Sequence, residues 1–174
     1  MKTSLLISAL LLTFSVMAQN NVHIGMSEAE LQSEFKNLEQ STYENTVTYT
    51  RPDTLYGLDS EWGYKFEDHK LNWIYFMRYE DELTDANFKS YLEACEKLIK
   101  DYTRIYGVPD SIINGDKTFK DPYIERHWGY DVLEARWYDA DGMKIKIRFT
   151  FMGGKGEYHF ILTIDMFDKS YPYF

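Results

Sequence analysis

Residues 83–109, with the sequence LTDANFKSYLEACEKLIKDYTRIYGVP, decide the fold of this chain. Their apolar side chains recur every three or four positions, which is the spacing that places them on one side of an α-helix. These residues are Phe88, Tyr91, Leu92, Cys95, Leu98, Ile99, Tyr102, Ile105 and Tyr106. Thr84 predicts the helix start as an N-cap, and Gly107 followed by Pro109 predicts its end. Because strand-like segments precede and follow the helix, we expect its apolar side to cover a β-sheet.

A shorter helix is expected after Ser27, because Ser27 and Glu30 have the spacing of a capping box. Its apolar residues are Leu31, Phe35 and Leu38, and its end is expected near residues 39–41. The helix start MSEAEL (26–31) is similar to the start of the long helix, LTDANF (83–88). This likeness favours two repeated α-then-β units, with independent convergence of helix caps as the alternative.

Between the two helices the apolar period changes to two, as in half-buried strands. Strands are expected at 43–50, 55–58, 62–66 and 71–79. A short turn at 67–70 would pair Phe66 with Leu71, so that the richer apolar sets of the last two strands share one face. In that register Ile74 and Phe76 point away from the long helix.

Three further strands with alternating apolar residues follow the long helix. They are expected at 133–137, 143–151 and 158–166, with turns at 140–142 and 153–156. The second turn would pair Phe149 with Phe160 and would place Lys144 opposite Asp165, a favourable cross-strand pair.

The short turns predict antiparallel pairing. The expected fold class is therefore α+β: an antiparallel sheet of about six to eight strands with one long and one shorter helix packed on it. Residues 19–174 are enough for a single domain with a sizeable core. The least regular stretch, residues 110–126, is expected to be a long loop with room for one short strand.

Residues 1–18 are predicted to be a secretory signal peptide that is cleaved after Ala18. Lys2 supplies the positive start, and residues 5–16 form an apolar run. No cysteine stands at the cleavage position, so we expect neither a lipid anchor nor another membrane anchor after cleavage. The expected location is periplasmic or extracellular. The only cysteine, Cys95, allows no intramolecular disulfide and is expected to be a small buried side chain.

The net charge of −9 predicts an acidic surface. Such a surface disfavours nucleic acid and anionic membranes as the main partner, because both carry negative charge.

Two short motifs resemble families of the bacterial envelope. IGMSEAEL (24–31) resembles the helix entry of the small outer-membrane-assembly proteins of SmpA/OmlA type. YGVPD (106–110) resembles the helix exit found there and in β-lactamase-inhibitor-like domains. The resemblance implies helices on one face of an antiparallel sheet and a binding or assembly role in the envelope. The lipid-anchor cysteine of the assembly family and the Gly-x-Pro that ends its first helix have no counterpart here, so no functional residue is carried over.

No set of residues in the sequence has the spacing of a catalytic or metal site. The four histidines, His23, His69, His127 and His159, form no metal-binding pattern. No Gly-x-Ser-x-Gly motif occurs, and the GGKG stretch at 153–156 is better interpreted as a hairpin turn than as a phosphate loop. We expect no metal and no cofactor, and a non-enzymatic role is favoured.

Two groups of side chains are candidates for binding. Ile74 and Phe76 are apolar residues expected on the helix-free face of the sheet, beside Arg78 on the same strand. The second group is a basic row in an acidic protein, Lys144, Lys146 and Arg148. The first hypothesis is an exported binding or assembly module that uses this face to hold an envelope or extracellular protein. The alternative is a small-ligand carrier or enzyme with an aromatic pocket near the 110–128 loop, where Glu125, Arg126, His127 and Trp128 lie together.

Overall fold

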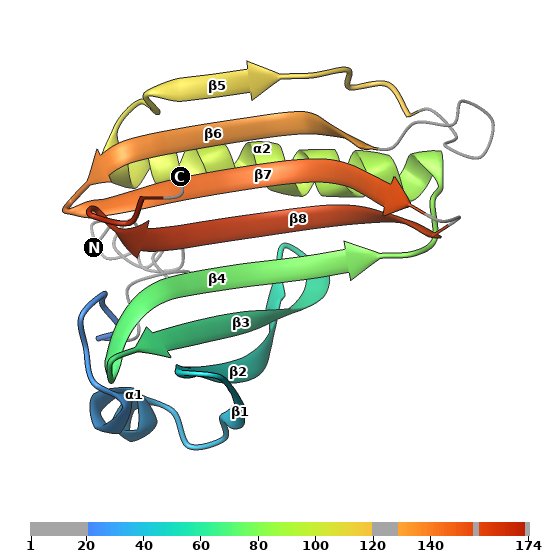
Figure 1. The fold of residues 1–174 in the computed structure, drawn as a ribbon. Coiled ribbons are helices and arrows are strands. Elements are labelled where there is room, and N and C mark those ends of the chain that lie inside the picture. The colour runs from blue at the N-terminus through green and yellow to red at the C-terminus, as the bar shows by residue number, and fades with distance from the viewer. Residues whose placement is uncertain (1–20, 120–128, 155–156, 173–174) are drawn as a thin grey trace, which may run out of the picture.

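The computed structural model describes residues 21–119, 129–154 and 157–172 (Figure 1). The predicted signal peptide and the Glu125 to Trp128 cluster lie outside the described residues. The elements are α1 (Glu28–Glu34), β1 (Glu39–Tyr43), β2 (Thr46–Leu55), β3 (Leu58–Glu67), β4 (Lys70–Glu80), α2 (Asp85–Tyr106), β5 (Ser111–Asn114), β6 (Gly129–Ala140), β7 (Met143–Gly154) and β8 (Glu157–Asp168). The expected α+β class and antiparallel sheet are therefore confirmed, with eight strands and two helices in the described part of the chain.

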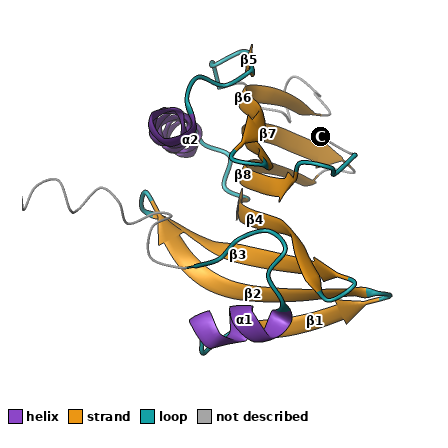
Figure 2. Ribbon diagram, turned by 90° about the vertical axis from the view of Figure 1, so that its left-hand side faces the viewer, coloured by secondary structure: helices purple, strands orange, loops and turns teal. Residues whose placement is uncertain are grey.

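All eight strands form one sheet in the order β1-β2-β3-β4-β8-β7-β6-β5. Each half of the chain contributes a helix followed by four consecutive strands. The halves meet at the centre, where β4 pairs antiparallel with β8. Figure 2 shows α2 alongside β6, β7 and β8, and α1 at the far end of the sheet beside β1 and β2.

Local sequence explains where α2 begins and ends. The backbone N–H of Asn87 donates to Oγ1 of Thr84, and Gly107 closes the helix with a φ of 83°, a conformation that suits glycine. The buried side of α2 consists of Phe88, Tyr91, Ala94, Cys95, Leu98 and Tyr102. The Phe88 ring contacts the rings of Phe149 on β7 and Phe160 on β8. The aromatic side chains of the helix thus fill the core against the C-terminal half of the sheet.

The shorter helix starts with the expected capping box, but it ends at Glu34 rather than near residues 39–41. The backbone at Phe35 is already extended, and residues 39–43 pair with β2 as an edge strand. The Phe35 ring packs on Tyr64, and the Arg51 guanidinium lies 4.6 Å from the Phe35 ring centroid. Strand pairing and these contacts therefore replace the last predicted turn of the helix.

The register of β4 differs from the sequence-based expectation because of a β-bulge. Phe66 pairs with Leu71 as expected, but Lys65 then pairs with Trp73, so Asn72 is an extra residue in β4. One extra residue turns every following side chain to the opposite face. Leu71 is buried on the helix side, as expected. After Asn72 the even-numbered residues of β4, rather than the odd-numbered ones, face the helix side.

The strands of the C-terminal half have the predicted orientation with altered pairing. Phe149 pairs with Leu162 rather than Phe160, and Asp165 pairs with Lys146 rather than Lys144. The turn after β7 is two residues shorter than expected, and a shift of two leaves each side chain on its predicted face. The turn after β6 contains two residues, and a bulge between Trp137 and Ala140 restores the predicted orientation.

Both helices lie on the same face of the sheet, which we call the helix-side face. Tyr91 of α2 contacts Phe149, and α1 contacts Tyr49 through a hydrogen bond from Tyr49 Oη to Glu28. Cross-strand pairs connect Tyr49 to Tyr64 and then to Ile74, which pairs with Met166. Among the described residues, no helix is both long enough and apolar enough to cross a membrane.

Candidate binding surfaces

The structure places Ile74, Phe76 and Arg78 on the helix-side face, which contradicts the expectation for Ile74 and Phe76. Ile74 is 6% exposed and Phe76 is fully buried, because the bulge at Asn72 turns both into the core. Arg78 faces the same side, where its Nε donates to the Tyr91 hydroxyl across 2.9 Å. These three side chains therefore hold the sheet to α2 and do not form an outer surface.

Lys144, Lys146 and Arg148 lie on the opposite face, which we call the helix-free face. They alternate along β7 with Ile145 and Ile147, which are fully buried on the helix side. The six candidate residues thus divide between the two faces of the sheet. Only the basic row keeps its predicted orientation.

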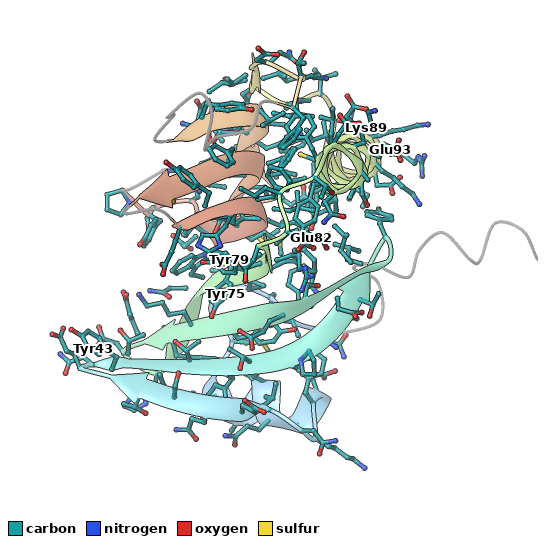
Figure 3. All side chains as sticks on the ribbon, turned by 90° about the vertical axis from the view of Figure 1, so that its right-hand side faces the viewer. Tyr43, Tyr75, Tyr79, Glu82, Lys89 and Glu93 are labelled. Atoms are coloured by element: carbon teal, nitrogen blue, oxygen red, sulfur yellow. The ribbon has the colours of Figure 1, made fainter. Side chains whose placement is uncertain are left out.

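The bulge brings a different set of β4 side chains to the helix-free face. These are Trp73, Tyr75, Met77 and Tyr79, which pair with Phe167, Asp165, Thr163 and Ile161 of β8. Figure 3 shows Tyr75 and Tyr79 on the other side of the sheet from Lys89 and Glu93 of α2. The Tyr75 ring lies across its cross-strand partner Gly63, where a Cβ would collide with the ring. Glycine at that position therefore makes room for an aromatic ring on the sheet surface.

Trp73 is the centre of an aromatic layer on this face. Its ring stacks on Phe167 with 5.3 Å between centroids, and Tyr171 stacks on the other side of Phe167 at 4.6 Å. Lys65 Nζ lies 5.5 Å from the Trp73 ring, within the range of a cation–π interaction. Lys144 Nζ donates to the Tyr171 carbonyl across 2.7 Å. The layer therefore joins β3, β4, β7 and β8 to the C-terminal residues.

A buried carboxylate lies beneath this layer. Asp165 is 5% exposed, accepts a hydrogen bond from Trp73 Nε1 at 3.2 Å, and lies 3.9 Å from Lys146 Nζ. Burial raises the pKa of Asp165, and the nearby charges of Lys146 and Arg148 partly oppose that shift. The Nε of Arg148 is buried and has no hydrogen-bond partner among the described residues. The site thus places two cations around one carboxylate and leaves one strong donor unused.

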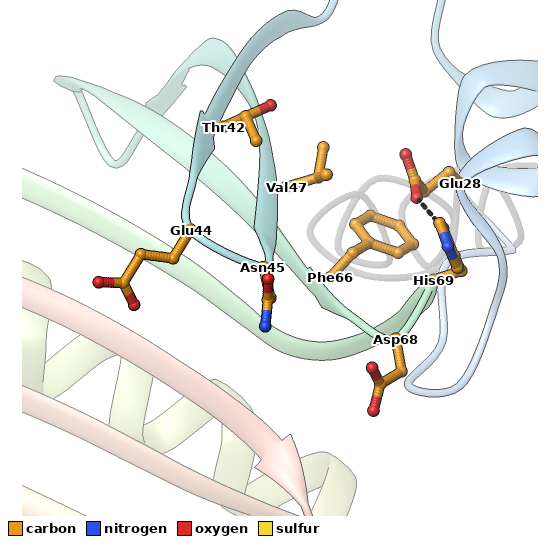
Figure 4. Close-up of a pocket in the computed structure, with 8 residues that line it drawn as sticks. All are labelled: Glu28, Thr42, Glu44, Asn45, Val47, Phe66, Asp68 and His69. Carbon is orange, nitrogen blue, oxygen red and sulfur yellow. Dashed lines mark hydrogen bonds and ion pairs between the residues drawn. The ribbon is translucent and has the colours of Figure 1, made fainter.

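A pocket lies near the β1 edge of the sheet (Figure 4). This pocket, of about 320 Å³, is lined by Glu28, Thr42, Glu44, Asn45, Val47, Phe66, Asp68 and His69. Within it, His69 Nδ1 lies 3.1 Å from a Glu28 carboxylate oxygen. The aromatic rings of the pocket lining are Phe66 and His69, and the pocket lies near the β1 edge of the sheet, whereas β5 forms the opposite edge. Within residues 21–119, 129–154 and 157–172, no group of three or more His, Cys, Asp or Glu side chains is arranged to hold a metal ion.

The aromatic pocket expected near the 110–128 loop stays a prediction, since His127 lies outside the described residues. The part of the loop that is described includes Phe119, whose ring packs on Phe88 and Phe160. This ring extends the core at the start of α2.

Comparison with protein families, with curated protein sequences and with solved structures gives no match for this chain. The helix-free face is the better candidate because it combines aromatic rings, cations and an unused buried donor. The residues of this face that sequence reasoning missed are Trp73 and Tyr75, because the Asn72 bulge that brings them there has no sequence signature. Asp165 was expected opposite Lys144 and lies opposite Lys146 instead.

Proposed function

We propose that this chain is a non-enzymatic binding module that holds an acidic, aromatic-bearing segment of a partner protein on the helix-free face of β4, β7 and β8. The observation that carries this proposal is the buried Nε of Arg148 next to Asp165. Arg148 as a whole is only half-buried, so a carboxylate of the partner can bind its incompletely satisfied guanidinium from the surface and neutralise the second cation.

Charge balance around Asp165 supports an anionic ligand. Asp165 is paired with Lys146 and also faces Arg148, whose cross-strand neighbour Glu134 is paired with Arg136. Three cations therefore lie around two carboxylates. Lys144 extends the basic row along β7. In a chain with net charge −9, this row is the part of the sheet that attracts a carboxylate locally.

The aromatic layer supplies the apolar part of the binding surface. Trp73 and Tyr75 are half-buried on the sheet, and Tyr79 is 50% exposed. Rings held flat against a sheet are suited to stack on aromatic side chains of a partner at little cost in conformational entropy. The signal-peptide prediction and the resemblance to envelope families direct the search for that partner to envelope and extracellular proteins.

Titration with a random copolymer of glutamate and tyrosine tests the proposal with a defined probe. We expect binding that weakens with added salt and that falls about tenfold in Arg148→Gln, since a charge-assisted bond is lost. Lys89→Gln on the exposed side of α2 is the matched control and should bind as the wild type does. Near-UV circular dichroism verifies that both variants fold. Equal binding by the wild type, Arg148→Gln and Lys89→Gln would exclude this face as the site.

We further propose that the two α-then-β halves are repeats of one unit. Each half consists of a capped helix and a four-stranded meander, and the β4·β8 pair joins the last strand of one half to the last strand of the other, with both helices on one face. A single rotation about an axis through the β4·β8 seam should superpose α1–β4 on α2–β8 in strand order. A best superposition that needs permuted strands would disprove the repeat.

A further inference from the structure

Exposed apolar side chains concentrate at one edge of the sheet. Among the described residues, eight large hydrophobic side chains are exposed, and five of these lie at the end of α2, in the turn to β5, on β5, or on the neighbouring strand β6. The five are Ile105, Val108, Ile112, Ile113 and Tyr138. Such a concentration in an acidic protein indicates an interaction surface.

Hydrogen bonds fix this edge to the body of the protein. Trp137 Nε1 donates to the Gly107 carbonyl across 2.8 Å, which anchors the end of α2. The backbone N–H of Tyr138 donates to the Asp110 carboxylate across 2.7 Å, which anchors the start of β5. The apolar residues are therefore presented on a fixed strand and helix end.

The side chains of β5 are apolar on both faces of the sheet. Ile112 pairs with Ala135 on the helix-side face, whereas Ile113 pairs with Glu134 on the helix-free face. A helix or a flat surface would cover only one of these faces. An added strand would cover both, because its side chains alternate between the two faces while its backbone pairs with the edge.

The two edges of the sheet differ in how they are protected. At the β1 edge, Glu39–Tyr43 has the sequence EQSTY and places exposed, mostly polar side chains along the strand. At the β5 edge, Ser111–Asn114 has the sequence SIIN, with neither charge nor proline. Charge and proline are the usual devices that stop an edge strand from pairing with another chain. The β5 edge lacks both.

We propose that two copies of this chain pair through their β5 edges, antiparallel and related by a two-fold axis, so that the two sheets become continuous. Because directly opposed residues share a face of the sheet, the two-fold axis passes through one residue of the strand. With Ile113 on the axis, Ile113 meets its own copy on the helix-free face, and Ile112 lies opposite Asn114 of the other copy. The strand is uncharged, so close approach of two chains of net charge −9 creates no like-charge pair within it. The β4·β8 seam shows that two α-then-β halves of this fold already join edge to edge in this manner.

Sedimentation of the full chain over a range of concentrations tests the proposal. We expect a monomer–dimer equilibrium that strengthens with added salt, because salt screens the repulsion between the acidic chains. Ile113→Lys should weaken the dimer at least about tenfold, since it places like charges at the paired edge. Tyr43→Lys makes the same kind of change at the β1 edge, where Tyr43 is 77% exposed, and should leave the dimer unchanged.

Cysteine cross-linking provides an independent measurement. Cys95 is fully buried, so a thiol introduced at the surface is the accessible one among the described residues. Under oxidation Ile113→Cys should form covalent dimers and Tyr43→Cys should not. A wild-type chain that stays monomeric at all concentrations overturns the proposal, even if another polypeptide binds to β5. A dimer that survives Ile113→Lys overturns it as well, and thermal unfolding verifies that each variant is folded.

Discussion

Replacing Phe76 with alanine tests the register of β4. Phe76 is fully buried, and its ring meets Trp62 with 5.3 Å between centroids and an interplanar angle of 63°. Truncation of such a ring costs about 3–5 kcal/mol, because the transfer free energy is lost and a cavity is left behind. A domain of this size has a free energy of unfolding of about 5–15 kcal/mol, so the loss is a large share of the total.

Urea unfolding followed by circular dichroism measures this effect. With a slope of about 1–3 kcal/mol per molar urea, the midpoint of Phe76→Ala should fall by about 1–3 M. Tyr79→Ala is the matched control, because Tyr79 lies three residues along the same strand and is 50% exposed on the helix-free face. Its cost should stay below about 1 kcal/mol.

The register expected from sequence alone reverses these two results. Without the extra residue Asn72, Tyr79 would face α2 and Phe76 would face solvent. If Tyr79→Ala destabilises the protein more than Phe76→Ala does, the bulge and the assignment of faces are wrong.

Two further predictions concern buried ionisable groups. Burial raises the pKa of Cys95 to about 12. A thiol reagent at neutral pH should therefore modify Cys95 only as fast as the protein unfolds. Rapid modification without denaturant would contradict the position of Cys95 in the core. Burial also raises the pKa of Asp165 above its value in the unfolded chain, so the folded state binds the proton more readily. The contribution of Asp165 to stability is therefore present at low pH and is lost as pH rises through the folded pKa. The unfolding midpoint of Asp165→Asn, relative to the wild type, should therefore be higher at pH about 7 than at pH about 3, and a difference that is independent of pH would refute the burial of this charge.

Local chemistry made the helices and the later strands predictable. Thr84 and Gly107 mark the ends of α2 through capping interactions within a few residues of each other, and the apolar period fixes its buried side. The orientation of Ile145 and Ile147 follows from simple alternation. These features need no knowledge of distant parts of the chain.

In the candidate site the orientation of the basic row could be predicted from alternation, but the aromatic part and the ion pair could not, because they depend on pairing between strands. The bulge at Asn72 is one inserted residue with no signature in composition, and it exchanges Phe76 for Tyr75 on the helix-free face. The pairing of Asp165 with Lys146 depends on a turn two residues shorter than expected. Alternation cannot detect such a shift, because both registers present the same faces.

The central position of β8 has a consequence for how the protein is made. Glu157–Asp168 is the last strand in sequence, yet it separates β4 from β7 in the sheet. During synthesis, β4 and β7 each keep an unpaired edge until these final residues emerge. Contacts between β4 and β8 are distant in sequence, and such contacts slow folding and prolong the exposure of strand edges. Chains that end before residue 157 should therefore aggregate rather than fold as a smaller sheet. Pairing of the C-terminal strand with β4 and β7 is then the step that completes folding of the whole chain.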